Sequence, residues 1–291
     1  MSDYSTASLP KPPGLLLATD FGAGCDRALE RTRQLAVELA LPVEVLTVRD
    51  APQAPAEVQS WLDDGAAPVR AEGLARREIA SEFDGATIQA HARFATGKVD
   101  EAILREAAAL PGYVVVTGAS HHESLARVIV GSTVERLARS LAQPLLVVRK
   151  RVRAPYRSIL VAIDGTDAAR RALRLAAGMF PGRPIVAFHV RTATEALNDQ
   201  VEAEVALERF IDACGVAPDA RARIEAAVGD GTPEAVLRRI AGQDAFDLAV
   251  LGLHEEPALR RLLMGSRSEQ LLRELACDTL LVPHGAPDAP P

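Results

Sequence analysis

Two Gly-Ser steps, Gly131-Ser132 and Gly265-Ser266, each stand directly before an amphipathic run. A helix that begins at such a step directs free backbone N–H groups and the positive end of its dipole at the space above it. Phosphate is the kind of anion that this arrangement stabilises. The two steps therefore indicate two candidate phosphate sites.

Both steps belong to a longer pattern that occurs twice in register. An earlier glycine precedes each step by thirteen positions, and an apolar run follows the amphipathic one. Three pairs of residues are each separated by 134 positions: Gly118 and Gly252, Gly131 and Gly265, and Ser132 and Ser266. An internal repeat therefore organises the chain into two halves.

A carboxylate ends the first apolar run of each half, which reads GLLLATD at 14–20 and RSILVAID at 157–164. Such uninterrupted runs are typical of buried parallel strands. Asp20 and Asp164 also have a purely structural interpretation, as caps of the next helix. Ser132 and Ser266 also have a structural interpretation, as N-caps, because a glutamate three residues after each serine completes a capping box.

The elements that must position these residues alternate along each half. The first half predicts strands at 14–20, 42–48, 87–94, 112–118 and 144–148, and helices at 26–39, within 55–82, and at 100–110 and 132–141. The second predicts strands at 157–164, 184–190, 222–228, 246–252 and 279–282, and helices at 167–179, within 193–214, from 233, and at 266–275. This alternation favours an α/β fold of right-handed βαβ units with helices on both faces of a parallel sheet.

Ligands of such doubly wound sheets bind outside the carboxyl ends of the strands, near the point where strand order reverses. Asp20 and Gly118 are expected at that point in the first half, and Asp164 and Gly252 in the second. The sequence therefore predicts one crevice in each half.

Composition excludes several classes of protein. The length of 291 residues suits two domains, and 48% hydrophobic with 25% charged residues is ordinary for a globular protein. A net charge of -6 argues against nucleic acid as the main partner. No run approaches the ~20 apolar residues of a membrane helix and the start of the chain lacks the apolar core of a signal peptide, so a cytoplasmic protein is expected. The three cysteines, Cys25, Cys214 and Cys277, predict neither a disulfide framework nor a zinc site.

Boundaries follow from proline content and charge. Residues 1–13 and 285–291 are expected to be disordered tails, 14–150 and 157–284 to be domains, and 151–156 to link them. The basic run RKRVRAPYR around this linker is interpreted as a solvated connector, with a nucleic-acid patch as the alternative.

Strong catalytic machinery is not visible. The chain has no HExxH motif, no P-loop and no GxGxxG in a dinucleotide context, and a Ser-His-Asp order is absent as well. His121, His122 and His254 lack the spacing of metal ligands. His189, at the end of an expected strand, is interpreted as a hydrogen-bonded structural histidine.

The two glycine regions, together with ATDFGAGCDRAL and AIDGTDAARRAL, resemble the universal stress protein family. Each half resembles one UspA-like domain, and the resemblance covers about residues 13–284. It implies two tandem five-stranded domains that are Rossmann-like and similar to adenine nucleotide α-hydrolases. Nucleotide-binding members carry Gly-x2-Gly-x9-Gly-Ser/Thr after the fourth strand and an acid after the first.

The resemblance implies a role for matching residues in an ATP site, with Mg²⁺ accompanying the nucleotide. Asp164 would approach the ribose and the backbone of Val190 would meet adenine, whereas three residues would surround the triphosphate: Gly252, Gly265 and Ser266. The first half holds the same places with Asp20, Val48, Gly118, Gly131 and Ser132. Glycines allow close backbone approach and the serine adds a hydroxyl to the helix N-terminus.

Both copies depart from the pattern at its second glycine, which is His121 in the first half and Glu255 in the second. A glutamate places negative charge near a polyphosphate, whereas a histidine can donate to one. The first site is therefore the better candidate for ATP.

The expected function is that of a cytoplasmic stress-response protein with a regulatory, not enzymatic, use of an adenine nucleotide. A protein-interaction scaffold without nucleotide and a slow ATPase are the alternatives. By resemblance the fifth strands, at 144–148 and 279–282, would pair antiparallel and join the halves as a pseudo-dimer, which would also cover two apolar edges. A further homodimer is left open.

Overall fold

The structure is a computed structural model that describes residues 11–22, 24–49, 67–84, 88–119, 132–191, 200–242, 245–253 and 275–284. The tails expected at 1–13 and 285–291 lie almost wholly outside these residues, and so does the helix expected at 266–275.

The first half contains five strands and four helices among its described residues. The strands are β1 (Leu15–Ala18), β2 (Val43–Arg49), β3 (Ala90–Thr96), β4 (Val114–Gly118) and β5 (Leu145–Val148). The helices are α1 (Asp26–Leu39), α3 (Ala67–Glu82), α4 (Val99–Ala108) and α5 (Ser132–Ser140).

The second half repeats this order. Its strands are β6 (Ile159–Ile163), β7 (Ile185–Arg191), β8 (Ile224–Asp230), β9 (Leu248–Leu253) and β10 (Asp278–Pro283). Its described helices are α6 (Asp167–Met179), α7 (Gln200–Ala213), α8 (Pro218–Arg221) and α9 (Pro233–Gly242).

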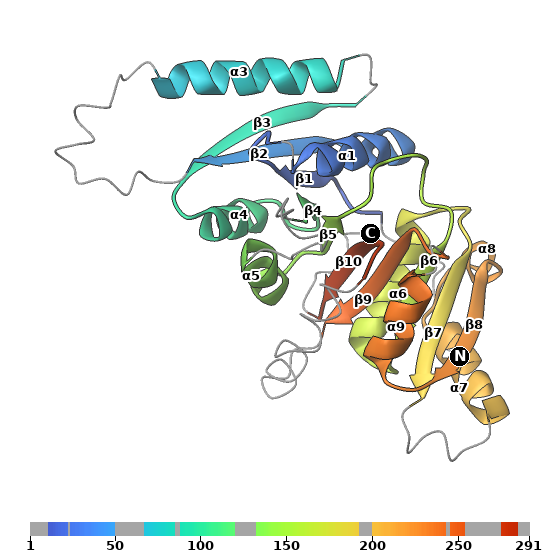
Figure 1. The fold of residues 1–291 in the computed structure, drawn as a ribbon. Helices are drawn as coiled ribbons and strands as arrows, with labels where there is room; N and C mark the ends of the chain where they lie inside the picture. Colours follow the sequence, from blue (N-terminus) through green and yellow to red (C-terminus); the bar gives the residue numbers. More distant parts are fainter. Residues whose placement is uncertain are drawn as a thin grey trace.

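All ten strands form one sheet in the order β3-β2-β1-β4-β5-β10-β9-β6-β7-β8. Neighbours are parallel within each half, as the α/β prediction requires. The halves meet where β5 and β10 pair antiparallel, with Leu146 opposite Leu280 (Figure 1). The two five-stranded sheets are therefore continuous through the middle of the molecule.

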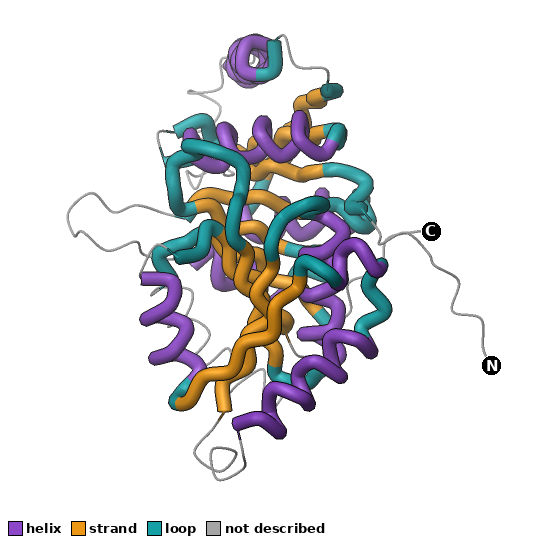
Figure 2. Tube along the Cα trace, turned by 90° about the vertical axis from the view of Figure 1, so that its right-hand side faces the viewer, coloured by secondary structure: helices purple, strands orange, loops and turns teal. Residues whose placement is uncertain are grey.

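Helices lie on both sides of this sheet (Figure 2). Successive strand residues alternate between the two faces, so Leu15 and Leu17 belong to one apolar cluster and Leu16 to another. The first cluster runs through both halves and includes residues of α1 and α6. One face of the sheet thus has a single core that does not stop at the boundary between the halves.

Several element bounds differ from expectation. α1 and α6 begin and end where the sequence predicts, whereas β3 starts at Ala90 because it pairs with β2 from Val43 to Arg49. The short helix α8, which begins at Pro218, was not predicted, and it delays the start of β8 to Ile224. Within the described residues, no helix has the length and apolar character needed to cross a membrane.

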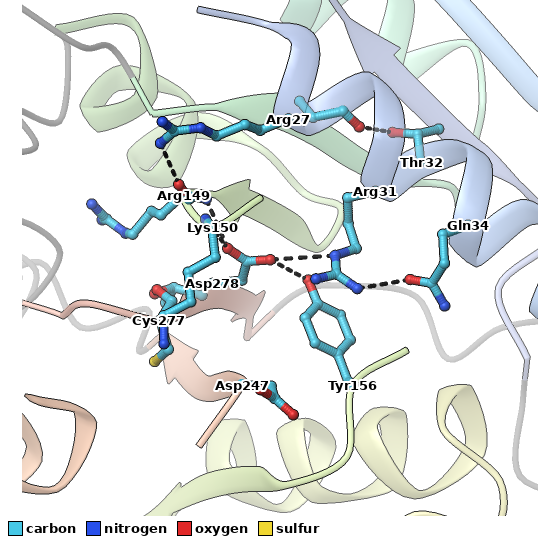
Figure 3. A network of polar contacts seen from close by, with 12 residues as sticks. Arg27, Arg31, Thr32, Gln34, Arg149, Lys150, Tyr156, Asp247, Cys277 and Asp278 are labelled. Atoms are coloured by element: carbon cyan, nitrogen blue, oxygen red, sulfur yellow. Dashed lines mark hydrogen bonds and ion pairs between the residues drawn. The ribbon is translucent and has the colours of Figure 1, made fainter. Parts of the chain in front are cut away.

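A buried carboxylate joins the two halves (Figure 3). Asp278, at the start of β10, is 0% exposed, and its Oδ1 accepts the backbone N–H groups of Arg149 at 2.7 Å and Lys150 at 2.9 Å. Its Oδ2 accepts the hydroxyl of Tyr156 at 2.7 Å and lies 3.4 Å from Nε of Arg31 on α1, an ion pair. The Asp278 carboxylate of the second half therefore bonds both to α1 of the first half and to the linker.

Further contacts surround this carboxylate. The Arg31 guanidinium lies 3.9 Å from the centre of the Tyr156 ring and donates to the carbonyl of Ala154 at 3.1 Å. Tyr156 also packs edge-on against Phe180, with ring centroids 5.7 Å apart. Arg27 donates to the carbonyl of Arg149 at 2.7 Å. The linker is thus held from both halves.

The interpretation of the basic run as a solvated connector is therefore wrong in part. Arg149 is 3% and Tyr156 1% exposed, although Arg151 and Arg153 face solvent. Burial lowers the pKa of Arg149 to about 10. Burial also raises the pKa of the Tyr156 phenol, and the Asp278 carboxylate adds to that rise, so the phenol stays a hydrogen-bond donor.

Replacement of Asp278 by asparagine is expected to destabilise the chain by about 3 kcal/mol or more, because it leaves the buried Arg31 guanidinium without its counter-charge. Urea unfolding of the full chain measures this. The matched control is Asp247→Asn: Asp247 precedes β9 and accepts the backbone N–H groups of Arg157 and Ser158, which an amide oxygen can also do. Equal stability of the two variants would contradict the role assigned to Asp278.

Candidate functional site

Three of the predicted site residues of the first half, Asp20, Val48 and Gly118, lie close together at one end of the sheet. β1 lies between β2 and β4, so strand order reverses there. Leu46 is level with Ala18, which puts Val48 level with Asp20. On the other side Val116 is level with Leu17, so Gly118 lies one residue from the level of Asp20.

The second half has the same geometry. β6 lies between β7 and β9, and its last residue, Ile163, is level with His189. Asp164 is therefore level with Val190, and the register of β9 puts Gly252 level with Ile163. Each half thus assembles an acid, a valine and a glycine at its switch point.

Not all predicted site residues can be placed. Ser132 is the exposed first residue of α5. His121, Gly131, Gly265 and Ser266 lie outside the described residues. So do Glu255 and the histidines at 122 and 254.

Asp20 and Asp164 are exposed acids that brace the loops after their strands. Asp20 accepts the N–H of Gly22 at 2.8 Å, and Asp164 accepts both the N–H and the hydroxyl of Thr166, the latter at 2.5 Å. Helix α6 is capped by Thr166, which accepts from Ala169, and α1 has Cys25 at its N-cap position. The interpretation of the two acids as helix caps is therefore wrong, because each is bonded within the loop that precedes the helix.

Gly118 and Gly252 are glycines for a packing reason. A Cβ at Gly252 would lie 2.5 Å from the carbonyl carbon of Ala168, and one at Gly118 would lie 2.9 Å from the carbonyl oxygen of Gly24. In both halves a strand end thus touches the backbone at or just before the start of the first helix. The close backbone approach that these two glycines allow is therefore to another part of the protein chain.

The thiol of Cys25 lies beside Asp20. Burial raises its pKa most, a hydrogen bond with the backbone of Asp20 opposes this rise, and the Asp20 carboxylate raises the pKa again through a hydrogen bond and through its charge, so the net shift is upward. The group is therefore a thiol at neutral pH and a poor nucleophile.

A cavity of about 450 Å³ lies at the carboxyl end of the second half's sheet. Its walls come from the end of β6, the end of β7 and one side of α7. The polar residues that line it are Asp164, His189, Arg191 and Glu202, and the larger apolar ones are Ile163, Leu207 and Phe210. A flat heterocycle with a polar substituent matches such a mixture of walls.

The polar groups of this cavity are held by neighbouring strands. Nδ1 of His189 lies 2.8 Å from the carbonyl oxygen of Ile163. A carbonyl can only accept, so Nδ1 carries the proton and Nε2 is an acceptor in the neutral ring. Nε of Arg191 donates to Asp230 on β8 at 2.7 Å, and its side chain is only 7% exposed.

Sequence reasoning missed most of this cavity. His189 is hydrogen-bonded as expected, but it also lines the cavity, and Arg191, Glu202 and Phe210 were not singled out. The two-residue period of β7 puts His189 and Arg191 on the same face at its carboxyl end, a signal that could have identified them. Nothing local marks Glu202 and Phe210, which depend on how α7 packs.

The described residues contain no group of three or more His, Cys, Asp or Glu side chains that could hold a metal ion.

Comparison with known proteins gives one consistent result. The sequence profile of the universal stress protein family matches residues 14–149 and 155–283. A universal stress protein of Thermus aquaticus is 32% identical over 136 residues, 44% of this chain and 98% of the relative. Universal stress protein Slr1230 of Synechocystis is 26% identical over 155 residues, 52% of this chain, and the match spans half of that relative's length.

The fold is similar to that of solved structures. A universal stress protein from Archaeoglobus fulgidus superposes with a TM-score of 0.72 at 19% identity, over 94% of this chain and 99% of that one. One from Pseudomonas aeruginosa gives 0.60 at 18% identity, over 94% and 93%.

Replacement of Gly252 by alanine is expected to cost about 1–3 kcal/mol of stability, since the backbone of α6 must shift to admit the methyl group. Gly118→Ala should cost less stability, because the atom nearest to its added Cβ, the carbonyl oxygen of Gly24, is 2.9 Å away. Gly73→Ala in α3 is the control: that position has open space around it, so alanine should be neutral or stabilise by up to about 1 kcal/mol. Thermal melting ranks the three, and a Gly252→Ala protein as stable as the unmodified chain would refute the packing argument.

Proposed function

The chain belongs to the universal stress protein family, of which it carries two domains in tandem, and from this premise we propose that it binds an adenine nucleotide in at least one half as a regulatory ligand. The role is that of a cytoplasmic stress-response protein whose bound and unbound forms differ in what they signal. Turnover of the nucleotide is not part of the proposal.

The cavity between β6, β7 and α7 is the observation that carries this proposal. It has the volume of a small-molecule site and lies at the carboxyl ends of β6 and β7, the edge of the sheet at which ligands of doubly wound folds bind. The Asp164 carboxylate is placed to accept from ribose hydroxyls, and the adjoining backbone of Val190 can meet the edge of a purine. The residues present thus fit the adenine and ribose of the ligand.

The first half repeats the acid, the valine and the glycine at its own switch point, with Ser132 at the start of α5. Residues 131 and 132 would hold phosphates through backbone N–H groups and a hydroxyl. Mg²⁺, if it accompanies ATP, would take its oxygen ligands from phosphates and water with Asp20 as a neighbour. His121 makes this half the better place for a charged nucleotide.

A regulatory role agrees with the side chains at hand. Cys25, beside Asp20, is kept as a thiol, and three polar residues of the second-half cavity, Asp164, His189 and Arg191, bond to strand and loop atoms of their own half. The continuous sheet supports treatment of the two halves as an intramolecular pseudo-dimer that joins through β5 and β10.

The test is equilibrium binding of ATP with Mg²⁺ to the purified full chain, read by calorimetry and by thermal melting. ATP at about 100 times its Kd should raise stability by about 2.7 kcal/mol. Asp20→Asn should weaken binding about tenfold, as a charge-assisted hydrogen bond becomes a neutral one. The control is Asp219→Asn, an exposed aspartate on α8 remote from both switch points.

Absence of nucleotide from denatured protein, together with an unchanged melting temperature at millimolar ATP, would contradict the proposal and favour a scaffold. Sustained hydrolysis that Asp20→Asn abolishes would instead favour an ATPase.

A further inference from the structure

The sheet ends at β3 in the first half and at β8 in the second, and neither strand pairs with a further described strand on its outer side. An outer strand presents backbone N–H and C=O groups to which another extended chain can bond. A cavity of about 490 Å³ lies against β3. The strand residues that line it, from Ala90 to Ala92, are at the amino end of β3, away from the switch points.

The hydrogen bonds to β2 determine which backbone groups of β3 point outwards. At the two ends of the strand, the carbonyl of Gln89 accepts from β2 and the N–H of Gly97 donates to it. The parallel register between these two positions is unbroken, so the odd-numbered residues of β3 bond towards β2. The N–H and C=O groups of Ala90, Ala92 and Phe94 therefore point to the outer side of the sheet.

Helix α3 lies alongside β3 and forms the other wall of the cavity (Figure 1). Ile79 of α3 is buried in the apolar cluster against which Ala90 and Ala92 pack. The guanidinium of Arg76 lies 5.1 Å from the centre of the Phe94 ring. The even-numbered side chains of β3 thus point to the face of the sheet that α3 covers.

The space between these walls, which we call the α3–β3 groove, is wide because several of its lining side chains are small. Ala80 on α3 and Ala90 and Ala92 on β3 line it, and Ile79 and Phe83 give it an apolar floor. Its volume is in the range of pockets that hold small molecules or inserted side chains. An apolar side chain from an added strand therefore has room to enter.

The groove also carries opposite charges at its two ends. Arg76 stands over Phe94, towards the carboxyl end of β3, and Asp84 lines the groove at the other end, four residues before Ile88. Both charged residues are exposed. A segment that lies antiparallel to β3 meets Arg76 with its first part and Asp84 with its last. An acidic residue followed by a basic one is complementary to this order.

We propose that the α3–β3 groove binds an extended peptide of a partner protein, which adds to the sheet as a further strand antiparallel to β3. Antiparallel ladders are slightly more stable per residue than parallel ones. Two apolar side chains, one residue apart, enter the groove, after an acidic residue that faces Arg76 and before a basic residue that faces Asp84. Backbone bonds to Ala90 and Ala92 supply affinity, and the groove and its charges supply selectivity. The proposal does not depend on nucleotide binding.

The probe is the capped, fluorescently labelled peptide Glu-Thr-Val-Thr-Val-Thr-Lys, which is titrated with the full chain and followed by anisotropy. We expect saturable binding that Ala92→Pro weakens at least about tenfold, because proline lacks the outward N–H. The ladder to β2 does not use this N–H, so the strand should tolerate proline there. The matched control is Ala226→Pro, at an equally outward N–H of β8, and it should bind the peptide unchanged.

A second variant tests the groove without any change to the backbone. Ala80→Phe fills the groove from an exposed position on α3 and should also weaken binding at least about tenfold. Thermal melting establishes that each variant is folded.

The charge order has its own test. Arg76→Glu should weaken binding about threefold, as expected for an exposed ion pair. A peptide with lysine in place of its glutamate should recover that loss on Arg76→Glu and bind the unmodified chain less well. If both peptides bind both proteins equally, the assigned orientation is wrong.

Lack of binding at millimolar peptide, or binding that Ala92→Pro and Ala80→Phe leave unchanged, would overturn the proposal. Dimerisation of the chain in sedimentation experiments that Ala92→Pro abolishes would assign this edge to a second copy instead of a peptide. None of these results bears on nucleotide binding at the switch points, so the two proposals fail separately.

Discussion

The arrangement of the two halves depends on one buried charge. Asp278 is fully enclosed, and a carboxylate so placed is tolerated only when every lone pair has a partner. Its partners come from α1 and from the connection between β5 and β6, so the carboxylate is satisfied only when the halves and this connection take their observed positions. The antiparallel pairing of β5 with β10 and the apolar cluster common to both halves rest on the same arrangement.

That arrangement explains why the same motif positions have two kinds of role. Gly118 and Gly252 are required because strand ends touch the backbone near the start of α1 and α6, whatever ligand is bound. Asp20 and Asp164 brace loops and remain exposed. Packing thus requires the same glycine at the switch point of each half, whereas it does not constrain the side chains around that point in the same way.

Much of the fold was predictable because its signals are local. α1 and α6 have apolar positions at helical spacing, so the bounds of these two helices follow from the sequence. The strands that precede them are recognisable as apolar runs that end in an acid. The position of the linker was not predictable, because Asp278 lies more than a hundred residues from Arg149 and Tyr156 and no local pattern connects them. For the same reason Phe210 and Glu202, which reach the cavity only through the packing of α7, were missed.

The most direct test of this account is a crystal structure of the full chain grown with ATP and Mg²⁺. The account predicts electron density for the adenine and ribose at the switch point of at least one half, with the ribose near Asp164 or Asp20. A structure with density for the nucleotide at neither switch point would contradict it.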